Sequence, residues 1–207
     1  MPCARRRCAT PLMPRVGPPK VVMMRSIWAI LVALLALVPT DAAGQWKVGG
    51  ETLPDTAWRK HEGAFGAWLV VSSEPRALVR EWDDPERTTP PVVREARFVI
   101  PEREFGLVVL FTNCAAGPDG NCDVTVDYRI LTPDREVAVE RRGLTVWRAK
   151  PPSADRLELG QCLWATSAEE SDPVGTYFFQ ATVTDHVTKR QITLEKPVEL
   201  KTAPPGK

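Results

Sequence analysis

The residues VTVDYRI, at positions 124–130, alternate strictly between apolar and polar side chains. Successive side chains of a β-strand point to opposite faces, so this pattern predicts a strand with one buried and one wet face. The same alternation recurs in residues 177–184, where Tyr177 and Phe179 begin the inward set. Two such strands indicate an antiparallel sheet that covers a core on one side.

Other segments extend this strand pattern in both directions along the chain. Residues 65–71 and 105–111 are apolar almost throughout, which predicts strands that are covered on both faces. Two more strands are predicted at Leu157–Ala165 and at Ile192–Leu200. Turn residues separate these segments, as they do in all-β domains.

One segment follows helical spacing. Ser73 suits a helix cap, Pro75 suits the first turn, and Leu78, Val79 and Trp82 then share one face. The sequence therefore predicts one short helix.

Shorter patterns complete the predicted fold. Ala96, Phe98 and Ile100 alternate with charged or neutral residues and predict a strand. Residues 137–147 predict a hairpin with Arg141–Gly143 at its tip. The sum is an all-β fold, an antiparallel β-sandwich of about 7–9 strands with one short helix.

The N-terminal region has the parts of an export signal. The apolar run Ile27–Val38 follows a basic residue and precedes small residues up to Ala43. Spanning a bilayer as a helix takes about 20 residues, more than this run offers, so we interpret residues 1–43 as a cleaved signal peptide. Residues 1–22 form an unusual extension, which a start at Met23 or Met24 would remove. The alternative is a long basic N-terminal region of the signal or a twin-arginine signal.

The rest of the chain is predicted to have three parts. Residues 44–63 form a leader or edge segment, residues 64–201 form the sandwich, and residues 202–207 form a disordered tail. Removal of the signal leaves 21 of the 27 basic and 25 of the 26 acidic residues. This mild acidity argues against nucleic acid or an anionic membrane as partner. We expect a periplasmic or extracellular protein, with no stable membrane insertion after cleavage.

Residues 172–177, Asp-Pro-Val-Gly-Thr-Tyr, carry a family resemblance. They resemble the start of the penultimate strand of immunoglobulin-like domains, where an acidic and a small residue precede a tyrosine. An alternating strand, a short polar turn and a final strand follow, an order similar to immunoglobulin-like and macroglobulin-like modules of exported bacterial proteins. The resemblance covers about residues 105–200. It implies an immunoglobulin-like sandwich and a role in binding, assembly or structure.

Three cysteines remain after the predicted cleavage. Cys114 and Cys122 stand at the facing ends of two successive predicted strands, so we favour a disulfide between them in an oxidising compartment. A bond from Cys162 to either of them is the alternative. As a free thiol, Cys162 would be a small buried hydrophobic residue rather than a nucleophile.

The loop within this predicted disulfide has a weak calcium-like pattern. Asp119, Asn121 and Asp123 are spaced as the first ligands of a calcium loop, but Val124 and Ile130 replace the glycine and glutamate that the pattern needs. Turns use the same residues to satisfy main-chain amides. We therefore predict a turn, with no metal and no cofactor.

No catalytic sequence motif is present, and each of the two histidines, His61 and His186, is interpreted as a surface side chain. If Trp46, Trp58 and Trp147 are exposed together, they would form a partner-binding face. The leading hypothesis is an exported, non-catalytic protein that binds a protein partner. The alternatives are a secreted hydrolase with a carboxylate or histidine site, and a structural envelope protein with a calcium-stabilised loop.

Overall fold

The structure is a computed structural model that describes residues 46–48, 51–86, 88, 91–154 and 156–202. The chain divides into two units, residues 1–40 and 41–207, and every described residue belongs to the second. The predicted signal peptide and almost all of the predicted tail lie outside the described residues.

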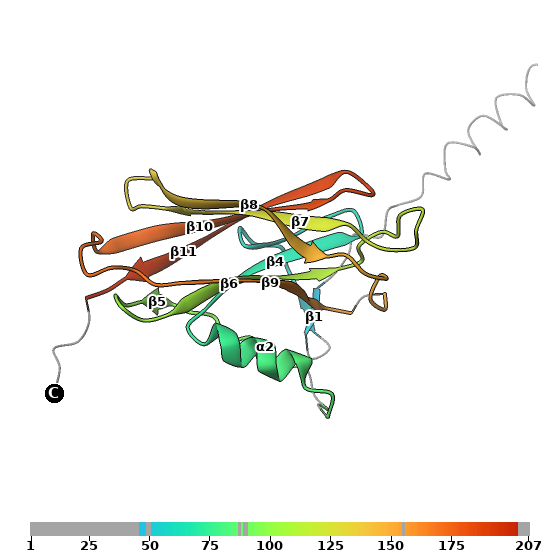
Figure 1. The fold of residues 1–207 in the computed structure, drawn as a ribbon, viewed down its shortest axis with the longest axis horizontal. Helices are drawn as coiled ribbons and strands as arrows, with labels where there is room; N and C mark the ends of the chain where they lie inside the picture. Colours follow the sequence, from blue (N-terminus) through green and yellow to red (C-terminus); the bar gives the residue numbers. More distant parts are fainter. Residues whose placement is uncertain (1–45, 49–50, 87, 89–90, 155, 203–207) are drawn as a thin grey trace, which may run out of the picture. The chain divides into compact units, whose positions relative to one another are not determined.

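Nine strands form two sheets that pack face to face as a β-sandwich (Figure 1). The first sheet has the order β5 (Phe98–Val99), β11 (Arg190–Leu200), β10 (Gly175–Asp185), β7 (Val124–Leu131) and β8 (Val137–Trp147). The second has the order β3 (Arg59–Glu62), β4 (Phe65–Ser72), β6 (Phe105–Thr112) and β9 (Glu158–Thr166). The predicted fold class, a mostly β sandwich with one short helix, is confirmed.

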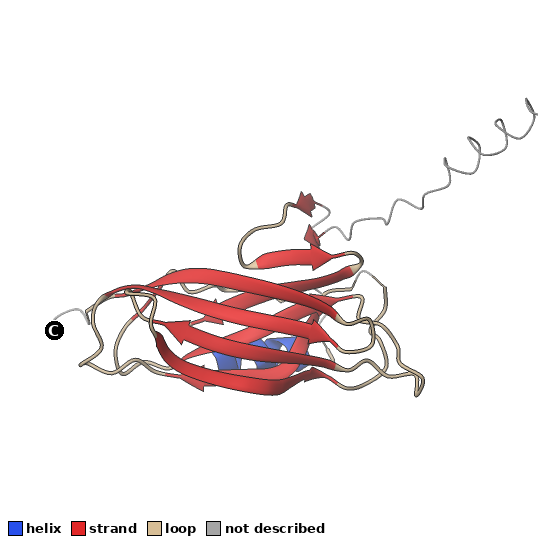
Figure 2. Ribbon diagram, turned by 90° about the horizontal axis from the view of Figure 1, so that it is seen from above, coloured by secondary structure: helices blue, strands red, loops and turns tan. Residues whose placement is uncertain are grey.

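Two smaller elements lie beside the sandwich. Strands β1 (Trp46–Val48) and β2 (Glu51–Leu53) pair as a separate two-stranded sheet. Helix α2 (Pro75–Asp83) covers the outer face of the four-stranded sheet and lies behind the strands in Figure 2. Within the described part of the chain, no helix is long and apolar enough to cross a membrane.

The connections are either hairpins within one sheet or crossings between the two sheets. Strands β7 and β8 form one antiparallel hairpin, and β10 and β11 form another. The links from β6 to β7, from β8 to β9 and from β9 to β10 pass from one sheet to the other. Almost all pairs are antiparallel, but the short β5 runs parallel to β11.

Strands β4 and β6 are apolar on both faces because a separate hydrophobic cluster covers each face. Between the sheets, Leu69 and Leu107 pack with the inward residues of β7, β10 and β11. On the outer face, Val70 and Val108 pack with Leu78 and other residues of α2. The prediction that these two strands are covered on both faces is confirmed.

The predicted hairpin at residues 137–147 is wrong, because β8 is one continuous strand. The register shifts where Val126 pairs with Leu144 but Tyr128 pairs with Arg141, so the strand contains a bulge. Gly143 has a φ of 65° and donates its N–H to the Asp127 carboxylate, 2.7 Å away. A glycine with positive φ is typical of such bulges and also of tight turns. The sequence alone therefore does not distinguish a bulge from a turn at this position.

Two smaller predictions also need correction. The helix cap is Glu74 rather than Ser73, and it makes no side-chain capping bond. Phe98 is exposed and Val99 is inward, because only these two residues pair with β11 and their alternation sets the faces. The segment 44–63, expected as a leader or edge segment, contributes the edge strand β3 with its last residues.

Candidate functional site

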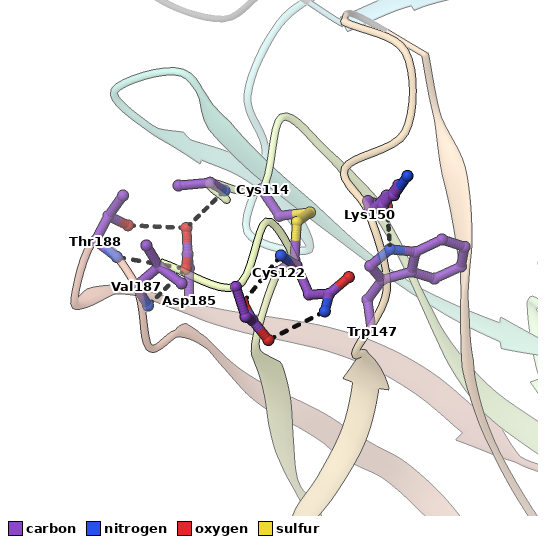
Figure 3. The surroundings of a disulfide bond; sticks show 10 residues. Cys114, Cys122, Trp147, Lys150, Asp185, Val187 and Thr188 are labelled. Atoms are coloured by element: carbon purple, nitrogen blue, oxygen red, sulfur yellow. Dashed lines mark hydrogen bonds between the residues drawn. A yellow bond between two sulfur atoms is a disulfide. The ribbon is translucent and has the colours of Figure 1, made fainter. Parts of the chain in front are cut away.

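Cys114 and Cys122 form a disulfide at the end of the sandwich where β7 begins and β10 ends (Figure 3). Both cysteines are buried, and the Cys122 N–H donates to the carbonyl of Ala149, 2.8 Å away. We call this the disulfide end. A structural disulfide is typical of a protein that resides in an oxidising compartment.

Asp185 joins the β10–β11 turn to the disulfide loop. Its fully buried carboxylate accepts hydrogen bonds from the N–H groups of Ala115, Val187 and Thr188 and from the Thr188 hydroxyl (Figure 3). These four hydrogen bonds compensate the negative charge of the buried carboxylate without a bound cation. The disulfide end is therefore held by a covalent bond and by a buried hydrogen-bond network.

The loop oxygens that resemble calcium ligands are engaged within the chain. Asp119 accepts bonds from the main-chain and side-chain nitrogens of Asn121, both 3.0 Å away. These bonds, the main-chain bond first, lower the pKa of Asp119. Asp123 pairs with Arg148 at 2.9 Å. Within the described residues, no group of three or more His, Cys, Asp or Glu side chains is arranged to hold a metal ion.

Cys162 is a free, partly exposed thiol on β9. Its side chain contacts the core between the sheets, and burial raises its pKa. A raised pKa leaves less of the reactive thiolate, so the side chain fits a structural role.

The three tryptophans proposed for partner binding pack on different neighbours. Trp46 exposes only 3% of its surface and lies 4.5 Å from the His61 ring. Trp58 is partly buried, and the Lys196 ammonium lies 4.7 Å from the centre of its ring. Trp147 is partly buried against Phe111. A shared exposed face of these rings stays a prediction, and the burial of Trp46 favours a packing role for that residue.

The two histidines make unlike contacts. His61 Nδ1 lies 2.8 Å from an oxygen of Asp55, and the imidazole is largely covered beside Trp46. His186 is exposed, and its Nε2 lies 2.8 Å from the Thr125 hydroxyl. This contact with Thr125 orients the ring, and among the described residues no hydrogen bond joins a carboxylate to it.

A buried ion pair holds the side of the sandwich where β3 and β11 meet. The Lys196 ammonium lies 2.6 Å from one oxygen of Glu95, and the other oxygen accepts a bond from the Trp68 indole N–H at 2.8 Å. Arg59 lies over the Trp68 ring, 5.1 Å from its centre, and burial lowers its pKa. Lys196 and Glu95 are partners within the chain, which fits a structural role, whereas the buried Nε of Arg59 has no hydrogen-bond partner.

The end of the sandwich that lies opposite the disulfide end has a different character. Strands β7 and β11 finish here, and β8 and β10 begin. Large exposed hydrophobic residues of the described chain are Val92 (63%), Phe98 (49%), Val137 (57%) and Val174 (59%), and the last three lie at this end. We call it the open end.

The open end contains a small cavity of about 80 Å³ between the two sheets. Val137 and Val174 do not line it, but they lie close to its wall in the sequence, since Ala138 follows Val137 and Asp172 precedes Val174 by two residues. Tyr177 also lines it, and the Tyr177 hydroxyl is buried without a hydrogen-bond partner. The tyrosine-corner bond that the family resemblance suggests is therefore not formed.

Sequence reasoning missed the open end as a site. Val137 was expected in a hairpin arm, and Val174 lies in the segment that resembles the start of an immunoglobulin-like strand. Neither position carries a pattern that predicts exposure. The one available signal was the Pro-x-Gly-x-Tyr segment, which places Val174 and Tyr177 close together.

Comparisons with known proteins find only distant structural similarity. No protein-family profile matches the chain, and no curated protein matches it. A family 123 glycoside hydrolase from Clostridium perfringens, reported for glycolipid glycan hydrolysis, shares 9% identity at a TM-score of 0.39 over 66% of this chain. This chain spans 28% of that hydrolase chain. A Niemann-Pick type C2 protein from Japanese carpenter ant shares 11% identity at a TM-score of 0.32, over 64% of this chain and 89% of that one. These low values transfer neither residue roles nor an activity.

Proposed function

We propose that the protein is an exported, non-catalytic binding protein whose protein partner docks on the open end of the sandwich. The observation that carries this proposal is the exposure of Val137 and Val174 at the end of the sandwich that contains the inter-sheet cavity. Exposed apolar residues around a pocket are typical of binding sites, because water is released when a partner covers them.

The difference between the two ends of the sandwich supports the same proposal. At the disulfide end, Asp185 and the cysteine pair hold the loops together, and polar contacts satisfy the exposed side chains. At the open end, a buried hydroxyl is unpartnered and apolar side chains face water. Departures from good packing and hydrogen bonding are common at functional sites.

Strand order supports an immunoglobulin-like relationship. Strands β11, β10 and β7 are adjacent, as are the last two strands and the third strand in immunoglobulin domains. Strands β4, β6 and β9 correspond to the first, second and fifth strands of the other sheet. Domains of this architecture serve as binding and assembly modules, so the analogy favours binding over chemistry.

Site-specific photo-crosslinking in exporting cells tests the docking end. A benzophenone amino acid replaces Val137 or Val174 in separate variants, and Asp119 at the disulfide end serves as the exposed control. We expect an adduct of one defined mass from the two valine positions and none from the control. Equal adducts from all three positions, or none from any, would contradict the proposal.

The same exporting cells also provide a test of export. The intact mass of the product in the envelope fraction is expected to correspond to a chain that starts at Ala43 or Gly44. A full-length product that stays in the cytoplasm would refute export without bearing on the open end.

A further inference from the structure

The cavity at the open end has the size of a small aliphatic group. Its volume is about 80 Å³, roughly half of the ~150 Å³ cavity that binds benzene in a designed protein core. Its wall is mainly apolar and includes Phe105, Ile130, Ala168 and Leu200. A branched group of about four carbon atoms fits this space, whereas an aromatic ring is too large.

The polar part of the wall is negative. Asp172 is the single carboxylate among the lining residues, and no lysine or arginine lines the cavity. Glu169 and Glu170 are exposed on the same loop. A cation at the mouth would therefore meet carboxylates, whereas an anion would be repelled.

The Tyr177 hydroxyl adds an unused hydrogen-bonding group beside this carboxylate. It is buried without a partner, which costs free energy in the unbound protein. Both side chains line the cavity, and burial and then the negative charge of Asp172 raise the pKa of Tyr177. A donor that enters the cavity could bond to both oxygens and relieve that cost.

We propose that this cavity anchors the partner by a branched aliphatic side chain that is carried next to a positively charged group. The aliphatic group fills the space between the sheets, and the cation lies against Asp172 and the Tyr177 oxygen. Val137 and Val174 then cover the surrounding apolar surface of the partner. This inference rests on the proposed function and specifies the chemistry of the partner.

Isobutylammonium is the probe, because it joins a branched four-carbon group to a cation. Titration of the processed protein, followed by NMR, is expected to give saturable shifts of the Ala168 methyl and Tyr177 ring signals, with a Kd on the order of 1–10 mM. Isobutanol, the neutral analogue, should bind several-fold more weakly, and the anion isobutyrate should not saturate.

Substitutions in the cavity wall distinguish binding inside the cavity from weak contact of the probe with the protein surface. Ala168→Leu fills the cavity and should abolish the saturable shifts. Ala138→Leu, at an exposed position of the cavity wall, should narrow the cavity. It provides a second test if the Ala168→Leu variant fails to fold. Ala116→Leu, on the disulfide loop, is the control and should leave binding unchanged. Asp172→Asn should weaken binding about fivefold.

Two results would overturn the inference. One is non-saturable shifts with all three compounds, and the other is unchanged amine binding in both filled variants. Failure of the proposed function is distinguishable, because the crosslinking experiment would then yield no adduct at positions 137 and 174 while the amine still bound.

Discussion

The buried carboxylate of Asp185 accepts a hydrogen bond from the main-chain N–H of Ala115 across 3.3 Å. Ala115 follows Cys114 directly, so this bond connects the last hairpin of the sandwich to the disulfide loop. The same carboxylate closes its own turn through Thr188. One side chain thus holds two loops that are far apart in the sequence.

Replacement of Asp185 by alanine should lower the free energy of unfolding by about 2–4 kcal/mol, because the donors around it lose their acceptor in a dry site. Urea denaturation measures the loss. Asp134→Ala, in the exposed β7–β8 turn, is the matched control and should change stability by less than about 0.5 kcal/mol. Equal effects of the two substitutions would show that the network contributes nothing.

Loss of the disulfide should cost about 2–3 kcal/mol, because the bond closes only a short loop and restricts the unfolded chain accordingly. Denaturation of the Cys114→Ser, Cys122→Ser double variant measures this cost. Thiol titration of the unfolded processed protein should find one free thiol, at Cys162. Persistence of a disulfide in the Cys114→Ser single variant would mean that Cys162 can pair instead.

Glu95→Gln should destabilise the protein by about 1–3 kcal/mol, because the largely buried Lys196 ammonium keeps its charge and loses its counterion. Lys196→Met should cost less, since Glu95 is partly exposed and still accepts the Trp68 indole bond. A double-mutant cycle by thermal denaturation measures the coupling between the two side chains. A larger loss for Lys196→Met than for Glu95→Gln would contradict this description.

Alkaline pH should unfold the protein through its tyrosines. The chain has two, Tyr128 and Tyr177, and burial raises the pKa of both. The folded protein therefore holds these protons more tightly than the unfolded chain, so stability falls as pH rises above about 10. Tyrosinate absorbance should stay flat until far-ultraviolet circular dichroism reports unfolding. Ionisation of either tyrosine in the folded protein would contradict the burial of both hydroxyls.

Gly143→Ala should cost about 1–2 kcal/mol, because alanine has to adopt a positive φ although the space around the residue is open. Gly143→Asn should recover part of the loss, since asparagine tolerates that conformation. Thermal denaturation of both variants measures the difference. Equal stability of the alanine variant and the native protein would show that the bulge is not fixed by this glycine.

The same glycine shows where prediction from sequence ends. A glycine after two arginines signals either a hairpin tip or a bulge, and only the pairing of β7 with β8 decides between them. In contrast, residues 124–130 were predicted correctly, because alternation of side chains depends on local strand geometry alone. Residues 105–111 were predicted correctly, because a continuous apolar run needs cover on both faces.

The open end could not be predicted for a related reason. Its cavity is lined by residues from β5 to β11, which meet only after both sheets have packed. Phe98 illustrates the difficulty, because its large apolar side chain favours an inward position, while parallel pairing with β11 turns it to solvent near Lys201.

Hydrogen exchange of the processed protein, alone and with the partner recovered by crosslinking, tests the docking site most directly. The account predicts slower exchange in residues 131–139 and 166–178 on complex formation, with no change in residues 113–123 at the disulfide end. Protection confined to residues 113–123, or no protection anywhere, would contradict it.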